Sequence, residues 1–556
     1  MNRRVYLQSF GGDRLAFRFI LLAALGAVAA LLYLPLLPTW FFADDPHWIG
    51  AVASRSLTEI LLVPETYRAV APNFTPWLAL TFKVDVALFG LAPLGYHIHD
   101  LLALALATWS FCLLMRRWLS WEAVLLAALL LWLSPITLAT ATWPSARHYV
   151  EGLLFAAVGL RWCLEPRETR WRSIGAGALF FLAAICKEIY VVLPAVTLIL
   201  VPGRLVERLK ATLWMWVSLA CYAAWHLWMM GGIGGYVTNS RPGPAAGLEL
   251  LRAIPRAFSQ HWFGGQSWPL IVLGIALAGG LAALGSLRPV AVFAVLAAPL
   301  LPIPAKVCEG HYSHARFVFH LSLVLLVVLA ALLDRWRRLA GIWRAAVVAS
   351  LAGLMATFLW QDLALSHHLR RDRDTARQSA AAFLEAGIGY VRAEQPRFFY
   401  EGLRRAYEAV THRSVGARLL PFDHLLRYAT PARLAELKGA GAAIPFAEIE
   451  RFQAGLADEP ISARLVLDRY RLTWELGPVE APAYTVMLGP EAGLYFVSAR
   501  NLPPRGSVML GQETASGASS AFLRVSYQPS GGAEVVTPEL VLPVPGTATV
   551  EYRKPR

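Results

Sequence analysis

The sequence predicts a polytopic α-helical membrane bundle of about 11 spans, followed by a C-terminal α+β soluble domain on the outer side. Three features of the 556 residues indicate this: 57% are apolar, only 16% are charged, and the mean hydropathy is +0.49. Soluble domains have about 25% charged and ~45–50% apolar residues. The same numbers exclude a disordered chain, because apolar residues are plentiful.

A membrane-spanning helix needs about 20 mainly apolar residues. The chain contains eleven such stretches, two of them short. We expect them at roughly 17–37, 92–115, 122–142, 146–163, 173–186, 189–202, 211–230, 267–286, 290–304, 316–333 and 343–363. The first stretch is long for a signal peptide and lacks a small-residue cleavage site, so we expect it to be retained.

The net charge of +14 follows the expected topology and does not indicate a nucleic-acid partner. Residues 1–364 hold 28 Lys+Arg and 17 Asp+Glu, whereas 365–556 hold 23 and 20. The expected inner segments carry 18 Lys+Arg in 63 residues, and the outer segments carry 10 in 125. By the positive-inside rule the N-terminus lies inside and the tail outside. We expect a protein of the cytoplasmic (inner) membrane, with its tail in the periplasm if it is bacterial.

The expected domains are a transmembrane catalytic bundle at 1–364 and an extracytoplasmic α+β domain at 365–556. The tail opens with a polar helical stretch and keeps apolar periodicity to about 440. From about 462 apolar residues alternate, which predicts strands and a β-sandwich at the end of the domain. We expect the tail to position the acceptor or cap the cavity and not to carry the chemistry.

The first outer loop places two adjacent carboxylates, Asp44 and Asp45, just beyond the first span. One interpretation is structural: Asp44 or Asp45 caps a helix that begins at Pro46, and Asp45 is the better placed of the two. The other is functional, because a carboxylate near the membrane surface serves as a general base or a metal ligand. The two interpretations are compatible, and both stay open.

Further polar residues gather in the other expected outer segments. An ionisable group at a span is a candidate functional residue, which singles out Asp100. The spacing of His97 and His99 also suits a metal, although interfacial histidines are common. The remaining candidates are Tyr67, Arg68, Arg147, Glu151, Lys187, Glu188, Lys306, Glu309, His311 and Arg316. All open to one side of the membrane, where acids and cations around one cavity suit group transfer from a phosphate donor.

The order of these motifs resembles the GT-C glycosyltransferases that use polyprenyl-phosphate sugars. The resemblance is to the branch of the protein O-mannosyltransferases and their tetratricopeptide-bearing transmembrane relatives, over roughly 15–330. The motifs are Asp44-Asp45, Tyr67-Arg68, Leu88-Phe89-Gly90 before Gly95-Tyr96-His97, Ser145-Ala146-Arg147, Lys187-Glu188 and Arg316. The chain departs from the family pattern at Ala69, Asp100, Tyr149 and Phe317, which leaves the acceptor and metal use open.

The resemblance implies an inverting transfer of a sugar from a polyprenyl-phosphate-linked donor to an acceptor hydroxyl on the outer face. A carboxylate takes the hydroxyl proton, and fixed cations stabilise the leaving phosphate. We expect Asp44 or Asp45 as the base, with Asp44 favoured. Donor phosphate binding is expected from Arg68, Lys187 and Arg316, with Arg147 and His311 as lesser candidates. No cofactor is certain, and a divalent cation (Mg²⁺ or Mn²⁺) stays open.

The expected partners are the lipid-linked donor, membrane lipid, and a protein, lipid or glycan acceptor, with no nucleic acid. Two other classes of function stay open. A transporter or flippase of lipid-linked saccharides would place charges near the bilayer midplane and show internal repeats, and neither is visible in the sequence. A membrane scaffold would leave the ordered motifs unexplained.

Overall fold

The computed structural model describes residues 11–71, 73–165, 170–232, 244–301, 311–335, 341–387, 390–442, 444–456, 461–467, 471–477, 483–509, 520–528, 532–543 and 548–552. The chain divides into two compact units. Unit 1 comprises Met1–Phe42 and Phe74–Asp374, and unit 2 comprises Ala43–Asn73 and Thr375–Arg556. This division differs from the expected domains, because the first outer loop belongs to unit 2 and the boundary falls ten residues after 364.

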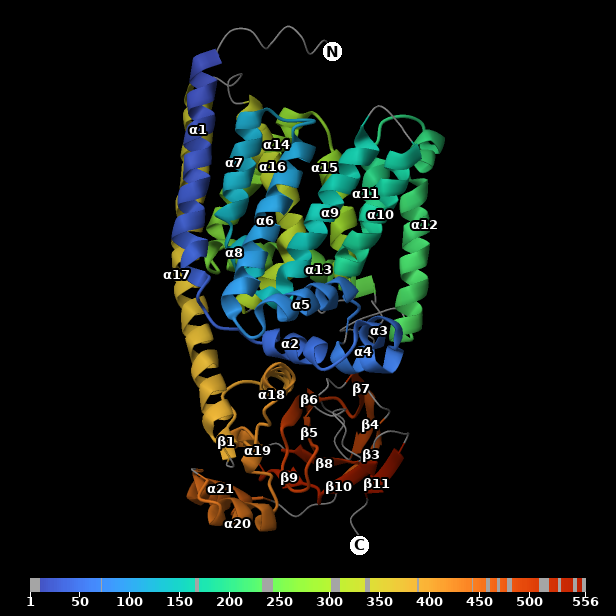
Figure 1. The fold of residues 1–556 in the computed structure, drawn as a ribbon, viewed down its shortest axis with the longest axis vertical. Helices are drawn as coiled ribbons and strands as arrows, with labels where there is room; N and C mark the ends of the chain where they lie inside the picture. The colour runs from blue at the N-terminus through green and yellow to red at the C-terminus, as the bar shows by residue number, and fades with distance from the viewer. Residues whose placement is uncertain are drawn as a thin grey trace. The chain divides into compact units, whose positions relative to one another are not determined.

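Unit 1 is helical, and its helices stand side by side in Figure 1. Its helices are α1 (Gly11–Val28), α5 (Pro76–Phe89), α6 (Pro93–Met115), α7 (Trp121–Trp132), α8 (Pro135–Ala141), α9 (Arg147–Leu164), α10 (Arg170–Cys186), α11 (Leu193–Leu200), α12 (Leu205–Met230), α13 (Pro244–Phe263), α14 (Trp268–Leu284), α15 (Arg288–Ala297), α16 (Phe319–Arg335) and the part of α17 (Gly341–Glu385) up to Asp374. Shorter turns of helix are η2 (Ala29–Tyr33), η3 (Leu34–Leu36), η4 (Pro144–Ala146), η5 (Glu188–Val192), η6 (Ala298–Leu300) and η8 (Tyr312–Val318).

Each stretch expected to span the membrane is mainly helical over its described residues, and 302–304 of the stretch 290–304 lie outside them. Among the described residues, four helices are long and apolar enough to cross a membrane, at Leu15–Leu36, Pro93–Met115, Tyr312–Leu332 and Ala345–Glu385. Two bent pairs raise this to six, since α7 with α8 turns by 64° and the Leu248–Phe263 helix with Trp268–Gly279 by 106°. The helices are those of an integral membrane protein. The count of about eleven spans and their orientation stay predictions.

Close helix packing in unit 1 depends on small residues. Helices α6, α9, α10 and α12 form neighbouring pairs along the bundle. A side chain at Gly177 of α10 would lie 2.8 Å from Trp214 of α12, and one at Gly152 of α9 would overlap the Tyr190 ring. Lipid tails are as apolar as the helix surfaces, so helices in a membrane gain little from burying apolar side chains. Small residues favour their association because they allow the backbones to approach closely. This packing fixes α9, which carries Arg147 at its first position.

Unit 2 combines short helices with strands. Its helices are α2 (Asp45–Ala53), α3 (Leu57–Leu62), α4 (Pro64–Val70), α18 (Arg397–Thr411), α19 (Asp423–Leu426), α20 (Pro431–Gly439) and α21 (Phe446–Ala454). Its strands are β1 (Tyr390–Arg392), β2 (Arg418–Leu420), β3 (Ser462–Leu467), β4 (Arg471–Gly477), β5 (Tyr484–Gly489), β6 (Val497–Leu502), β7 (Arg505–Met509), β8 (Ser520–Tyr527), β9 (Val535–Val536), β10 (Leu540–Pro543) and β11 (Ala548–Tyr552).

The strands from β3 onward form a sandwich of two sheets. One sheet has the order β11-β3-β4-β7, and the other β10-β8-β5-β6 with β9 beside β8. Both bury alternate residues in one core, for example Leu465 and Trp474 from the first sheet with Val486 and Leu523 from the second. Alternation puts every second side chain on one face of a strand, which is why the sequence signal is readable from about 462.

Candidate functional site

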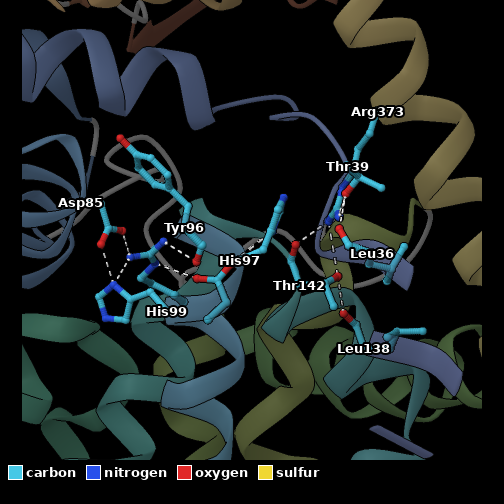
Figure 2. Close-up of polar contacts among 11 residues, drawn as sticks. Leu36, Thr39, Asp85, Tyr96, His97, His99, Leu138, Thr142 and Arg373 are labelled. Carbon is cyan, nitrogen blue, oxygen red and sulfur yellow. Dashed lines mark hydrogen bonds and ion pairs between the residues drawn. The ribbon is translucent and has the colours of Figure 1, made fainter. Parts of the chain in front are cut away.

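A buried ion cluster surrounds Arg147 at the start of α9. Arg147 is fully buried, and its Nε lies 2.8 Å from Asp100 Oδ1 of α6. Its Nη1 donates to Asp85 Oδ2 of α5, and its Nη2 donates to the Tyr96 carbonyl at 3.3 Å. Figure 2 shows Asp85, Tyr96 and His99 close to one another. Three helices are thus joined through one side chain.

Two histidines extend the cluster. His99 Nδ1 lies 2.8 Å from Asp85 Oδ1, and its Nε2 lies 3.3 Å from Glu151 Oε1 on α9. His97 is buried, and its Nδ1 lies 3.6 Å from Asp100 Oδ2. Glu151 is 5% exposed, and its second oxygen has no hydrogen-bond partner among the described residues. The cluster therefore holds three carboxylates against one guanidinium, with His99 lying between two of them.

A second buried guanidinium, that of Arg373, ties three distant segments of unit 1 together. Arg373 on α17 is 1% exposed, and its Nη1 donates to Thr39 Oγ1 at 2.7 Å. Its Nη2 donates to the carbonyl and hydroxyl oxygens of Thr142 (Figure 2). Thr142 precedes the turn that leads into Arg147. Arg373 therefore links α17 to the segment after the first span and to the entry of α9.

Lys187 and Arg316 form a cationic part of the site. Lys187 is 5% exposed, and its Nζ lies 2.8 Å from Glu188 Oε2. Glu188 Oε1 in turn accepts from the Phe74 backbone amide at 3.0 Å. The Arg316 guanidinium lies 4.6 Å from the centre of the Trp143 ring. The charges of both cations act on the buried ring of His148.

An apolar cavity of about 310 Å³ begins one helical turn beyond Lys187. Tyr190 and Leu193 belong to its lining, and the Tyr190 backbone amide bonds to the Lys187 carbonyl at 3.1 Å. The rest of the lining is mainly aliphatic and comes from α6, α9, α11, α15 and α16. A cationic group beside a long apolar cavity suits an amphiphile with an anionic head and a hydrocarbon tail.

The acid pair, Asp44 and Asp45, lies in unit 2. The start of the helix that follows differs from the one we expected. Helix α2 begins at Asp45, and Asp44 occupies the N-cap position without a side-chain cap hydrogen bond. Asp44 is the N-cap because its carbonyl accepts the first hydrogen bond of the helix, from Trp48 N at 3.1 Å. Asp45 is fully buried and Asp44 half-buried. The expectation that Asp45 caps a helix starting at Pro46 is therefore wrong.

The first loop brings the acid pair and Arg68 into the same unit. His47 Nε2 lies 2.7 Å from the Val70 carbonyl, which joins the start of α2 to the end of α4 where Arg68 lies. Tyr67 is buried, and its hydroxyl donates to the Asn73 carbonyl at 2.9 Å. Burial lowers the His47 pKa to about 4, and the charges of Arg405 and Arg55 act in the same direction.

Other predicted site residues lie outside these groups. His311 is exposed, and its ring packs against Tyr312 and Phe42. Lys306 and Glu309 lie outside the described residues. Because Asp44, Asp45, Tyr67 and Arg68 belong to unit 2, the expected meeting of all the candidates around one cavity stays a prediction.

Sequence reasoning missed Asp85, His99 and Arg373 as cluster members. Asp85 lies in a stretch that reads as an ordinary amphipathic helix, and His99 was weighed only as a metal ligand. Arg373 lies in a charged run that resembles a solvated helix face. Its burial depends on the partner segments at Thr39 and Thr142, more than 200 residues away, so no local signal reveals it.

The described residues do not gather a set of metal ligands. No group of three or more His, Cys, Asp or Glu side chains among them lies close enough to hold a metal ion. The acids of the buried cluster are bound to Arg147 or His99, so a cation would have to displace these partners. We therefore derive no step through a metal.

No protein-family model matches the chain, and no curated protein matches it. Among solved structures, it is similar to ArnT from Cupriavidus metallidurans in the apo state, with 15% identity and a TM-score of 0.48, over 76% of this chain and 95% of that one. ArnT bound to undecaprenyl phosphate has 14% identity and a TM-score of 0.44, over 74% and 90%. The archaeal oligosaccharyltransferase AglB from Archaeoglobus fulgidus, in complex with an inhibitory peptide and a dolichol-phosphate, has 13% identity and a TM-score of 0.42, over 73% and 65%.

The predicted resemblance to GT-C polyprenyl-phosphate-dependent glycosyltransferases is confirmed as a likeness to their structures.

Proposed function

We propose that the protein is an inverting glycosyltransferase that moves a sugar from a polyprenyl-phosphate-linked donor to an acceptor hydroxyl at the outer face of the membrane. The observation that carries the proposal is the buried Lys187 side chain, which lies three residues before Tyr190 in the lining of an apolar cavity of about 310 Å³. A lipid phosphate has the two parts that this arrangement suits, a charged head and a hydrocarbon tail.

Donor binding is assigned to Lys187 and Arg316. Lys187 is buried, and the Arg316 guanidinium lies 4.6 Å from the centre of the Trp143 ring, both within unit 1. Fixed cations in a water-poor pocket stabilise the charge that the phosphate gains as the glycosidic bond breaks. Glu188 keeps Lys187 oriented through their contact at 2.8 Å. Arg68 of unit 2 remains a further proposed phosphate ligand, with His311 a lesser one.

The base is assigned to the first loop. An acceptor hydroxyl is a weak nucleophile until a positioned carboxylate takes its proton. Asp44 is favoured over Asp45, because Asp44 is half-buried at the N-cap and Asp45 is fully buried as the first residue of α2. A carboxylate acting from the face opposite the phosphate gives inversion at the anomeric carbon, as in single-displacement glycosyl transfer.

The test uses the full chain in proteoliposomes with undecaprenyl-phosphate monosaccharides and an envelope extract as the acceptor source. The readout is release of undecaprenyl phosphate, which does not require the acceptor to be known. Asp44→Asn should lower turnover by ~10²–10⁴ and leave donor binding nearly unchanged. Asp85→Asn is the comparison for a buried acid of the Arg147 cluster. Wild-type turnover in both Asp44→Asn and Asp45→Asn would sink the mechanism.

The lipid part has its own measurement. Binding of undecaprenyl phosphate without a sugar should weaken when the cavity is narrowed, for example by Ala156→Phe. The matched control is Ala183→Phe on α10, a buried alanine outside the cavity lining, which tests for a general packing defect. Equal affinity in wild type and Ala156→Phe would remove the cavity from the donor site.

A further inference from the structure

The backbone of α2 lies directly against the backbone of α18, within unit 2. A Cβ atom on Gly402 of α18 would lie 2.5 Å from the Pro46 carbonyl oxygen and would overlap the His47 backbone. A Cβ atom on Gly50 of α2 would overlap the Gly402 carbonyl. Real Cβ atoms essentially never come within 3.0 Å of such atoms, so both positions require glycine for this packing.

The His47 side chain fixes α2 from a second direction. Its Nε2 lies 2.7 Å from the Val70 carbonyl at the end of α4. Its ring meets the Phe398 ring of α18 edge to face, with 6.1 Å between the centroids. The same residue therefore contacts α18 through its backbone and ring, and α4 through its ring nitrogen. Such over-determination holds a short helix that could not be stable alone.

The acid pair, Asp44 and Asp45, is held in place together with α2. Asp45 lies two residues before His47 in the same helix, and Asp44 is its N-cap. The residue before them, Ala43, has φ +48°, in the left-handed region that non-glycine residues rarely adopt. A strained residue persists only where the surrounding structure over-determines it. The backbone conformation of Ala43 and the contact between Gly50 and Gly402 together fix the positions of the two carboxylates.

We propose that α18 of the tail is the platform that positions the acid pair, with Gly50, Gly402 and His47 as positioning residues. This inference rests on the proposed function, in which one of the two acids is the base. It gives the tail a direct part in the reaction, beyond the acceptor placement or cavity capping expected from the sequence. A displaced α2 moves a base by the same amount, and misplacement of about 1 Å can cost ~10²-fold in rate.

The test compares Gly402→Ala with Gly439→Ala in the full chain. Gly439 ends α20 of the same unit, and nothing lies within 4 Å of a Cβ placed there. Gly402→Ala should lower kcat about tenfold or more, with the KM for the undecaprenyl-phosphate sugar within twofold of wild type. Hydrogen exchange of amides 45–53 should also rise. The Gly439→Ala variant should match wild type in all three measurements.

A milder variant covers the case in which Gly402→Ala does not fold. Phe398→Leu removes the ring contact to His47 without inserting an atom between the helices, and it should lower kcat several-fold at unchanged KM. Unchanged kcat and unchanged exchange at 45–53 in a folded variant would overturn the inference. If Asp44→Asn or Asp45→Asn is inactive while Gly402→Ala turns over normally, the positioning role alone fails. If both Asp variants are fully active, the proposed function fails instead.

Discussion

Arg147 Nε lies 2.8 Å from Asp100 Oδ1, and both side chains are at most 2% exposed. Asp85 is a second partner, so the Arg147 guanidinium forms ion pairs with two carboxylates. A donor phosphate would have to compete with both. This geometry favours a role in joining α5, α6 and α9 over the lesser role in phosphate binding that the sequence suggested for Arg147.

The first prediction concerns this ion cluster. Arg147→Met should lower the free energy of unfolding by about 3–5 kcal/mol, because it leaves buried carboxylates without their cation. Arg161→Met on the same helix is the control. Arg161 is 39% exposed and lies 3.5 Å from Glu165, so its loss should cost about 1 kcal/mol or less.

Thermal unfolding of both variants in the same detergent measures the difference. Equal shifts of Tm for the two variants would show that the buried cluster adds no stability beyond a surface pair.

The second prediction separates the proposed donor cation from other lysines. Lys187→Gln should weaken binding of undecaprenyl phosphate by roughly 2 kcal/mol or more, about 30-fold, because the proposed phosphate contact is made by a buried ammonium. Lys210→Gln on α12 replaces an exposed lysine and should leave the affinity unchanged. Titration in nanodiscs gives both values. Matching affinities for the two variants would remove Lys187 from the donor site.

The sequence predicted the helical stretches and the strands well because their signals are local. Apolar runs of about 20 residues and the alternation around Leu465 need no knowledge of distant residues. The assignment of the first loop to the tail could not be predicted, because it depends on the meeting of Gly50 and Gly402 across 352 positions. In the sequence alone, both glycines read as ordinary interruptions of a helix.

Several residues of the candidate site could be predicted from the sequence, but the residues that each of them contacts could not. Asp100 was singled out as an ionisable group at a span and Arg147 as a cation of an outer segment, and they do meet. Asp85 carries no distinguishing signal, since a single acid in an amphipathic helix is normally solvated. The cap at the first loop was misassigned because proline is common at the first helical position, whereas here Pro46 is the second residue of α2.

The third prediction tests the strain at Ala43. Ala43→Gly relieves the cost of φ +48° but adds freedom to the unfolded chain, so stability should stay equal or rise by up to about 1 kcal/mol. Ala53→Gly, at the end of α2, has no such strain to relieve and should lower stability by about 0.5–1 kcal/mol. The Tm of Ala43→Gly should therefore be equal to or above that of wild type, and the Tm of Ala53→Gly below it. A destabilised Ala43→Gly variant would mean that Ala43 is not strained.

The last prediction follows from the His47 pKa of about 4, which lies below the ordinary value of 6.5 because partial burial of the ring disfavours its charged form. Between these two values the unfolded chain binds a proton that the folded chain does not. Stability should therefore fall as the pH drops from about 6.5 to about 4, by at most ~1.4 kcal/mol per pH unit from this group, and level off below. Because His47 is only partly excluded from solvent, the total should be on the order of 1–3 kcal/mol.

His47→Gln should reduce this slope of stability against pH, whereas His368→Gln, which replaces an exposed ring, should keep it. Tm measured from pH 4 to 7 for the three proteins gives the slopes. Identical slopes for wild type and His47→Gln would show that the His47 ring accepts a proton as readily in the folded chain as in the unfolded one.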